Sequence, residues 1–292
     1  MTHSLILGPR AYSSWSLRAW LLFERFDIPR SQRFIEFDTP VADQLAAHPP
    51  ARTVPTAIFD DGAVVSDSLA IAEELHSRHP LAGLWPEDPE KRAAARNLAA
   101  EMHSSFGSLR NDCPMALRVS YSDFTPSDGV KADLKRICDL WTYAKTTFSE
   151  DGPWLFGRYT AVDAFYAPVA ARIATYDLTV EGIAAEYVAT HLSDPAFRRW
   201  RAKGLVVGRD LARYAKPNAQ RAWPTNPPIT TTLSDGPSLN ETCPFSGKPV
   251  AHFFETANGK VGFCNPGCRD KAMQDPMAFP EVARILSEQN SL

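Results

Sequence analysis

Two groups of residues in this sequence have the types and the spacing to do chemistry. The first is the stretch YSSWSLR, where hydroxyl side chains gather directly before the first predicted helix: Tyr12, Ser13, Ser14 and Ser16. One serine is enough to cap a helix, because its side-chain oxygen accepts a hydrogen bond from a backbone N–H of the first turn. The same helix end attracts negative charge. The remaining hydroxyls are therefore candidates for binding a ligand.

The second group is a set of three cysteines near the end of the sequence. Cys243 is followed after twenty residues by Cys264, and Cys264-Asn-Pro-Gly-Cys268 places two thiols on one tight turn. Thiolates with this spacing can converge on a soft or borderline metal ion. Three cysteines can also pack as small apolar residues. However, a segment of about fifty residues buries little core, and a closed metal site would add stability.

Composition and charge exclude several classes of function. The chain has 292 residues and a formal net charge of −3 with no block of like charge, which argues against a nucleic-acid or membrane-surface partner. It begins without the pattern of a signal peptide, and no apolar run reaches the roughly 18 residues of a membrane span. We therefore expect a cytoplasmic protein. Cys113 and Cys138 stand alone in helical sequence, so structural disulfides are not expected.

The elements that position the hydroxyl cluster follow from hydrophobic periodicity over residues 1–80. The apolar run SLILG predicts a strand, and the segment SWSLRAWLLFERF that follows predicts a helix. A second strand is then predicted at QRFIEFD and a short helix at VADQLAA. Two further strands around an Asp-Gly turn are predicted at TAIFDDGAVVSDS. SLAIAEELHSR closes the region as a helix with Ser66 or Asp67 at its N-cap. The order β-α-β-α-β-β-α predicts a thioredoxin-like α/β domain.

Residues 86–215 read as an all-α bundle. Asp88-Pro89-Glu90 starts one helix, and Thr160 with Asp163 has the spacing of a capping box. The segment AFYAPVAARIATY is apolar on every side, which places it at the centre of the bundle. Residues 216–241 are rich in proline and are predicted to be a linker. Residues 242–292 form a small domain with a predicted hairpin around Asn258-Gly259.

The first 215 residues resemble a cytosolic glutathione transferase. Three segments carry the resemblance in the right order: YSSWSLR, Thr53-Val54-Pro55, and SDSLAI at residues 66–71. Each alone could be an ordinary loop or cap, but together they are specific. YSSWSLR is similar to the serine signature of zeta-like and related bacterial members, although Trp15 stands where the zeta enzymes have cysteine.

This resemblance implies a role for each segment. Ser13, with Ser14 as its neighbour, would hydrogen-bond the thiol of reduced glutathione and favour the thiolate, leaving Ser16 as the helix cap. Tyr12 is a rival, since other members of the superfamily use tyrosine. Val54 would pair its backbone with the cysteinyl part of glutathione through a cis peptide before Pro55. Separately, Asp67 and Ser68 would bind the γ-glutamyl end.

The resemblance implies a homodimeric enzyme that adds glutathione to an electrophile between its two domains. Met102, Phe106, Arg110 and Trp141 are possible lining residues, though such residues at helical spacing more often belong to a core. The alternatives are a glutathione-dependent isomerase of the maleylacetoacetate type and a non-catalytic docking or metal-sensing module. No cysteine precedes Cys113, which disfavours chemistry through a protein mixed disulfide.

The last fifty residues resemble small treble-clef-like domains of the TRASH and YHS kind. That resemblance implies Zn²⁺ as the metal of Cys243, Cys264 and Cys268, in a structural or sensory site. Ser246 occupies the place where a second cysteine would complete a Cys-x-x-Cys knuckle, so only three thiolates are available. The fourth ligand would then be His252 or water.

Overall fold

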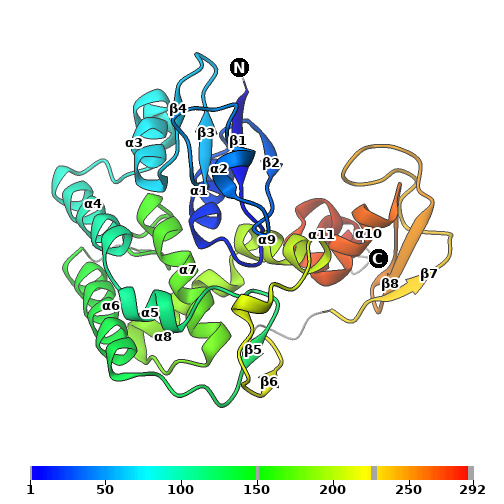
Figure 1. Cartoon of the computed structure of the whole chain (residues 1–292). Coiled ribbons are helices and arrows are strands. Elements are labelled where there is room, and N and C mark those ends of the chain that lie inside the picture. The colour runs from blue at the N-terminus through cyan, green and yellow to red at the C-terminus, as the bar shows by residue number, and fades with distance from the viewer. Residues whose placement is uncertain (1, 149–150, 225–228, 289–292) are drawn as a thin grey trace. The chain divides into compact units, whose positions relative to one another are not determined.

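The computed structural model describes residues 2–148, 151–224 and 229–288, and the chain divides into two compact units (Figure 1). The first unit contains the residues up to Leu192 together with Leu211–Pro224. The second contains Ser193–Asp210 together with the residues after Pro224. Helix α9 (Pro195–Val206) therefore belongs with the C-terminal residues and not with the helices that precede it.

A four-stranded sheet with the order β2-β1-β3-β4 forms the N-terminal part of the first unit. β1 is parallel to β2 and antiparallel to β3, and β3 is antiparallel to β4. With its helices this sheet has the thioredoxin-like order that the sequence predicts. The elements are β1 (His3–Leu7), α1 (Ser14–Arg25), β2 (Arg30–Phe34), α2 (Val41–Gln44), β3 (Thr56–Ile58), β4 (Val64–Val65) and α3 (Ser68–Arg78).

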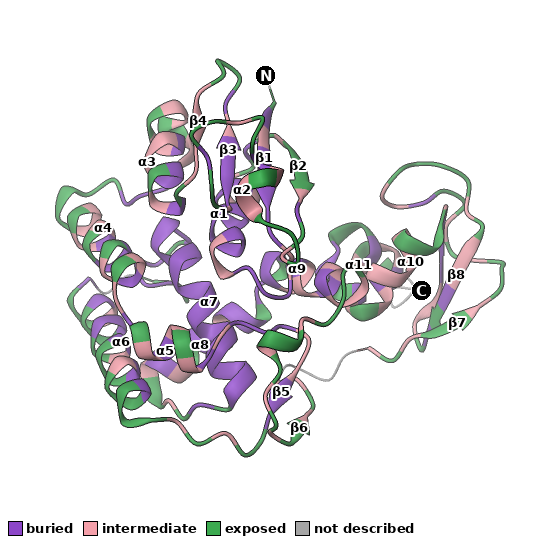
Figure 2. Cartoon of the chain, in the orientation of Figure 1, coloured by how far each residue is buried: buried purple, intermediate pink, exposed green. Residues whose placement is uncertain are grey.

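The helical part of the first unit is built around one buried helix. Every residue of α7 (Ala161–Tyr176) is buried, as Figure 2 shows along its length, and it contacts both α1 and α4. This confirms the prediction made from its apolar sequence. The capping box is also present: the carboxylate of Asp163 accepts a hydrogen bond from the backbone N–H of Thr160 at 2.8 Å. The surrounding helices are α4 (Pro89–Ser104), α5 (Gly107–Asp112), α6 (Asp128–Thr147) and α8 (Gly182–Ser193).

Short strands occupy both ends of the proline-rich segment 216–241. β6 (Gln220–Arg221) pairs with β5 (Ser120–Tyr121), and Arg221 forms an ion pair with Asp177 at 2.8 Å. β7 (Thr232–Ser234) instead pairs with β8 (His252–Thr256) in the sheet of the second unit. The segment thus begins as part of the first unit and ends as part of the second.

The second unit has its own sheet and its own core. Its sheet has the order β7-β8-β9, and β8 pairs antiparallel with β9 (Gly259–Phe263), which confirms the predicted hairpin. Helices α10 (Pro266–Gln274) and α11 (Pro280–Ser287) contact this sheet, and α10 also contacts α9. Residues from these elements share one core: Ala202, Cys243, Phe254, Val261, Phe263, Ala272, Ala278, Phe279, Val282 and Leu286. The predicted fold class is therefore confirmed, with a thioredoxin-like part, a helical part and a small C-terminal sheet beside three cysteines. The predicted helical domain 86–215 differs from the structure, because Ser193–Asp210 with α9 packs in the second unit.

Candidate functional site

The hydroxyls at the start of α1 form a small hydrogen-bonded cluster. Ser13 is the N-cap: its Oγ accepts from the backbone N–H of Ser16 at 3.3 Å and donates to the Ser16 Oγ at 2.7 Å. The Ser16 Oγ also accepts from the backbone N–H of Gly8 at 2.9 Å. The prediction that Ser16 caps the helix is wrong, because the helix begins at Ser14 and Ser16 lies in its first turn, tied to the loop after β1.

Gly8 allows this loop to pass close to the helix. A side chain at this position would place its Cβ 2.6 Å from the Phe37 ring and 3.1 Å from the Cβ of Ser13, both too close for ordinary packing. A side chain at Gly8 would force the Phe37 ring and Ser13 to move, so glycine suits the close approach of this loop to the Ser16 hydroxyl. This contact fixes the first turn of α1, and with it the position of both Ser13 and Ser14.

Ser14 and Tyr12, the neighbours of Ser13, have different partners. Ser14 is partly exposed, and its Oγ accepts a hydrogen bond from an Arg172 Nη at 3.4 Å. The Tyr12 hydroxyl accepts from the backbone N–H of Leu211 at 3.3 Å, and its ring packs on Tyr214 with centroids 4.7 Å apart. Ser13 and Ser14 therefore both lie at the N-terminus of α1, but their hydroxyls have different surroundings. The Ser13 hydroxyl is buried against the first turn of the helix, and the Ser14 hydroxyl lies beside the Arg172 guanidinium.

Ser13, Ser14 and Val54 line one cavity of about 260 Å³. The Val54–Pro55 peptide bond is cis, as the resemblance implied. Thr53 and Thr56 hold this loop: the Thr53 hydroxyl donates to the carbonyl of Ser66 at 3.1 Å, and the Thr56 hydroxyl donates to the carbonyl of Thr53 at 2.7 Å. Three of the residues predicted for a glutathione site thus meet around one hollow.

Asp67 and Ser68 lie at the N-terminus of α3 and are not among the residues lining that cavity. The Asp67 carboxylate caps the helix by accepting from the backbone N–H groups of Leu69 at 2.8 Å and Ala70 at 3.0 Å. Its other oxygen lies 3.3 Å from Nε2 of His103. The Ser68 hydroxyl is buried without a hydrogen-bond partner among the described residues, which is unusual for a buried polar group.

Among the cavity-lining residues that the sequence analysis did not select are two arginines, Arg18 and Arg172. Of the four lining residues suggested from the helical region, Arg110 lies on the cavity wall, whereas Met102 and Trp141 are fully buried core residues and Phe106 is also buried away from it. A signal was available: Arg18 lies within YSSWSLR itself, and Arg172 is the single charged residue in AFYAPVAARIATY.

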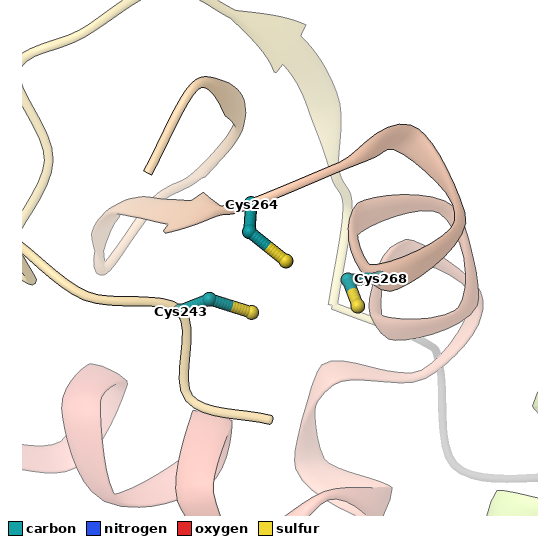
Figure 3. A group of neighbouring side chains, drawn as sticks. All are labelled: Cys243, Cys264 and Cys268. Atoms are coloured by element: carbon teal, nitrogen blue, oxygen red, sulfur yellow. The ribbon is translucent and has the colours of Figure 1, made fainter. Parts of the chain in front are cut away.

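The three C-terminal cysteines form a second, separate cluster within the second unit. The Sγ atoms of Cys243, Cys264 and Cys268 all lie within 4.8 Å of one another and point into the same space (Figure 3). A tetrahedral zinc ion with Zn–S bonds of about 2.3 Å separates its sulfur ligands by about 3.8 Å, so small side-chain movements would accommodate it. His252, at the start of β8, is not one of the metal-ligand residues gathered there among those that the structure describes.

Neighbouring groups favour the thiolate form of one cysteine of this cluster, Cys243. Burial alone would raise the pKa of the Cys243 thiol, but hydrogen bonds from the Cys264 backbone and the Ser246 hydroxyl bring it down to about 7. Burial raises the pKa of Cys268, partly offset by Lys271. Asn265 caps α10 through the Cys268 backbone at 2.9 Å, and its amide donates to the Cys264 sulfur at 3.2 Å. The local turn thus holds two of the three sulfurs in place.

No helix in the described parts of the chain is long and apolar enough to cross a membrane.

Residues 12–78 match the family model of the glutathione S-transferase N-terminal domain. Among curated proteins, a probable maleylacetoacetate isomerase of Caenorhabditis elegans is 34% identical over 112 residues, which is 35% of this chain and 50% of that protein. The rice protein IN2-1 homolog A is 28% identical over 124 residues, covering 42% of this chain and 46% of its own length. The chain therefore spans about half the length of these relatives.

Solved structures show the same fold. A glutathione transferase homologue from Burkholderia with bound glutathione aligns with a TM-score of 0.55 and 19% identity, over 71% of this chain and 100% of its own. Glutathione transferase Omega 3C from Trametes versicolor aligns with a TM-score of 0.52 and 17% identity, over 74% and 92% of the two chains. These findings show that the first unit shares the fold of glutathione transferases, and that residues 12–78 match the N-terminal domain of that family.

Proposed function

We propose that this chain binds reduced glutathione in its first unit, stabilises the thiolate with a serine hydroxyl, and adds the sulfur to an electrophile. The observation that carries the proposal is the meeting of Ser13, Ser14 and Val54 around one cavity, next to a segment (residues 12–78) that matches the glutathione S-transferase N-terminal domain. At neutral pH only a few per cent of a free thiol is ionised. For this role the Ser13 hydroxyl would turn its one proton from the Ser16 Oγ, to which it donates at 2.7 Å, toward the sulfur. A donor at the N-terminus of α1 favours the anion, because the helix end carries partial positive charge.

The remaining glutathione contacts follow the same proposal. The backbone of Val54 would pair with the cysteinyl part of the peptide. Asp67 would bind the γ-glutamyl ammonium, and Ser68 with the N-terminus of α3 would bind its carboxylate. The unpartnered buried hydroxyl of Ser68 supports this role, since such a group is normally satisfied by a partner. On binding, the thiol loses its proton to solvent. The sulfur lone pair then forms the new S–C bond, and the displaced electrons either leave with a leaving group or move along a conjugated double bond, whose far atom takes up a proton from solvent.

Two variants separate the capping role of Ser13 from its proposed chemical role. Ser13→Ala removes both the cap and the hydroxyl, whereas Ser13→Gly removes the hydroxyl but costs the helix only a few tenths of a kcal/mol. Both variants should keep glutathione binding in calorimetric titration and lose about 10- to 1000-fold in turnover, as expected when one stabilising hydrogen bond is lost. Ser77→Ala, on the exposed surface of α3, is the matched control and should keep full turnover.

The outcome also distinguishes the rival hydroxyls. Ser14→Ala and Tyr12→Phe are measured under the same conditions, with the ultraviolet absorbance of the bound thiolate as a second readout. Full turnover in both Ser13 variants together with loss in Ser14→Ala would transfer the role to Ser14. Full turnover in all the serine variants with loss in Tyr12→Phe would refute the serine mechanism. The homodimer and the isomerase reaction implied by the resemblance stay predictions for the same purified protein.

A second proposed activity, metal binding, rests on the cysteine cluster. Three sulfurs within 4.8 Å of one another fit the ligand set of a zinc ion, with water or the hydroxyl of Ser246 available as a fourth ligand. The Ser246 Oγ lies 3.2 Å from the sulfur of Cys264. We expect close to one equivalent of zinc in the purified full chain by elemental analysis, lost in Cys264→Ser and retained in Cys138→Ser, a cysteine of α6 outside the cluster. Metal-free protein with all three thiols reduced would contradict this proposal.

A further inference from the structure

The three cysteines of the second unit differ in how far they are buried. Cys243 is 1% exposed and belongs to the buried core of this unit, whereas Cys264 and Cys268 are partly exposed and pack against that core. All three are free thiols. A small molecule in solution can therefore contact the side chains of Cys264 and Cys268, while Cys243 is covered.

One short turn joins the two partly exposed cysteines. Cys264 directly follows β9, and Cys268 lies in the first turn of α10, with the exposed residues 265–267 between them. Asn265 holds both ends of this turn: its side-chain oxygen accepts from the Cys268 backbone N–H at 2.9 Å, and its amide donates to the Cys264 sulfur at 3.2 Å. The turn thus fixes the two cysteines side by side at the surface of the unit.

The sulfur atoms of these two cysteines are close enough to be joined after small movements. The three Sγ atoms of the cluster lie within 4.8 Å of one another, and Figure 3 shows those of Cys264 and Cys268 pointing into the same space. A disulfide brings its two sulfurs to about 2 Å. Since residues 265–267 are exposed, rotation of the two side chains and a small adjustment of the turn would close the gap without displacing the core.

Cys264 is placed to react first with an oxidant. Its sulfur accepts from the Asn265 amide and lies 3.2 Å from the Ser246 hydroxyl. Hydrogen bonds of this kind stabilise negative charge on sulfur, and the thiolate is the nucleophile in thiol oxidation. Oxidation-sensitive cysteines are typically accessible thiols beside a second cysteine that completes a disulfide. Cys264 has these features, and Cys268 is the accessible second cysteine.

The two cysteines of the first unit have different surroundings. Cys113 is fully buried, and burial raises the pKa of its thiol to about 12. Burial also raises the pKa of the Cys138 thiol on α6. A thiol with a raised pKa has little of the reactive thiolate at neutral pH. Cys113 and Cys138 therefore serve as internal references for a thiol that reacts slowly.

From this arrangement we propose that Cys264 and Cys268 are a site of reversible oxidation, at which hydrogen peroxide converts the two thiols into a disulfide. The Cys264 thiolate attacks one oxygen of the peroxide, the O–O bond breaks, and the departing hydroxide takes up a proton to become water. The Cys268 thiolate then attacks the sulfur of the Cys264 sulfenic acid, the S–O bond breaks, and a second water forms. The two thiols supply two electrons and two protons, and a thiol reductant restores them.

The inference extends to regulation of the proposed metal site, and this part alone rests on the metal proposal. A disulfide between Cys264 and Cys268 removes two of the three thiolate ligands, so oxidation and metal binding exclude one another. The core of the unit consists largely of residues outside the cluster, among them Phe254, Val261 and Phe263. The unit can therefore stay folded in both states, as a reversible site requires.

Trypsin cleavage after Lys260 and Arg269 places both cysteines in one peptide, VGFCNPGCR, which gives a direct test. The full chain is stripped of metal with a chelator, treated with hydrogen peroxide, alkylated, digested and analysed by mass spectrometry. This peptide should contain an internal disulfide that dithiothreitol reverses, formed at least about 10-fold faster than the thiols of Cys113 and Cys138 are lost. Zinc at about ten times its dissociation constant leaves about a tenth of the sites free and should slow the reaction about 10-fold.

Two variants assign the reaction to the proposed pair. Cys268→Ser should lose the internal disulfide and leave Cys264 as a sulfenic acid, which dimedone captures on the same peptide. Cys138→Ser is the matched control, because it removes a cysteine outside the cluster, and it should form the disulfide at the wild-type rate.

The outcomes separate failure of this inference from failure of the metal proposal. The inference is overturned if Cys264 and Cys268 are oxidised no faster than Cys113 and Cys138. It is also overturned if the disulfide joins Cys264 to Cys243, which would link two different tryptic peptides. A disulfide within VGFCNPGCR that forms equally fast with and without zinc would support the oxidation site and overturn the proposal that the cluster binds zinc.

Discussion

His191 should make the stability of the first unit depend strongly on pH. It lies on α8, is 1% exposed, and packs its ring against Trp154 and Tyr187 at centroid distances of 5.1 Å and 4.5 Å. Its Nε2 has no hydrogen-bond partner among the described residues. Burial, together with the nearby charge of Arg25, lowers its pKa from 6.5 to about 3. The folded chain therefore holds this imidazole neutral throughout the mildly acidic range.

The sign of the effect follows from proton binding. In the unfolded chain His191 takes up a proton as the pH falls through about 6.5, whereas in the folded chain it stays neutral until about pH 3. The unfolded state binds more protons in this window, so the free energy of unfolding falls as the pH falls. Between pH 7.5 and pH 5 the loss from this one group is about 2 kcal/mol, because the slope of about 1.36 kcal/mol per pH unit for one proton applies over roughly the 1.5 units below the unfolded pKa of 6.5.

The measurement compares wild type with His191→Leu by urea unfolding at pH 7.5 and pH 5, followed by tryptophan fluorescence. The variant loses ring contacts and should be less stable at both values, but its stability should fall about 2 kcal/mol less between them. Taking the difference between the two proteins removes the contribution of groups that titrate in both. An equal fall in wild type and variant would show that His191 is protonated in the folded chain and would refute the reasoning.

Two further substitutions test how the helical part is held together. Asp163→Asn should lower the free energy of unfolding by about 2–4 kcal/mol in chemical denaturation. The buried carboxylate accepts hydrogen bonds from the Tyr187 hydroxyl at 2.6 Å and the Thr160 backbone N–H at 2.8 Å, and an amide has only one oxygen to accept them. A change below about 0.5 kcal/mol would contradict this. Gly152→Ala should cost about 2 kcal/mol or more in thermal unfolding, since φ is +127° and a Cβ would lie 2.3 Å from the carbonyl oxygen of Gly157. Gly107→Ala, with open space around it, is the control and should be neutral or slightly stabilising.

Local patterns in the sequence predicted the elements well. Apolar residues on every side of AFYAPVAARIATY can be satisfied only by complete burial, and α7 is buried throughout. The capping box at Thr160 and the hairpin at Asn258-Gly259 also depend on residues close together in the chain. In each case the physical cause lies within a few residues, so the sequence alone was sufficient.

The sites were harder to predict, because they depend on contacts between distant segments. Arg18, Arg110 and Arg172 meet only because α1, α5 and α7 converge on one cavity, and nothing local to any of them reveals the others. The capping error at α1 has a different cause. With Ser13, Ser14 and Ser16 all able to cap, the choice depended on the contact between Gly8 and Ser16, which joins the loop after β1 to the helix.

The second unit has a larger core than the sequence suggested, because α9 belongs to it. The sequence suggested that about fifty residues bury too little core and need a closed metal site. In the structure α9 adds Ala202 to the core and ties the C-terminal helices through Arg198, which pairs with both carboxylate oxygens of Asp275 at 2.8 Å and 2.5 Å. Arg199 also donates to the carbonyl of Ala278 at 3.0 Å. None of these contacts involves the cysteine cluster, so they would stabilise this unit in addition to any metal ion bound there.

This argument gives a prediction for the full chain that separates metal binding from folding. In Cys264→Ser the metal should be lost while the β8–β9 hairpin keeps most of its protection in amide hydrogen exchange, because Phe254, Val261 and Phe263 remain buried in the shared core. Zinc-dependent domains without such a core are unfolded when the metal is removed. Loss of protection throughout β8 and β9 in this variant would mean that the metal supplies the folding free energy and that α9 contributes little. Retained protection would assign the cysteine cluster to reversible metal binding or sensing, since an ion that is not needed for folding can bind and dissociate while the unit stays folded.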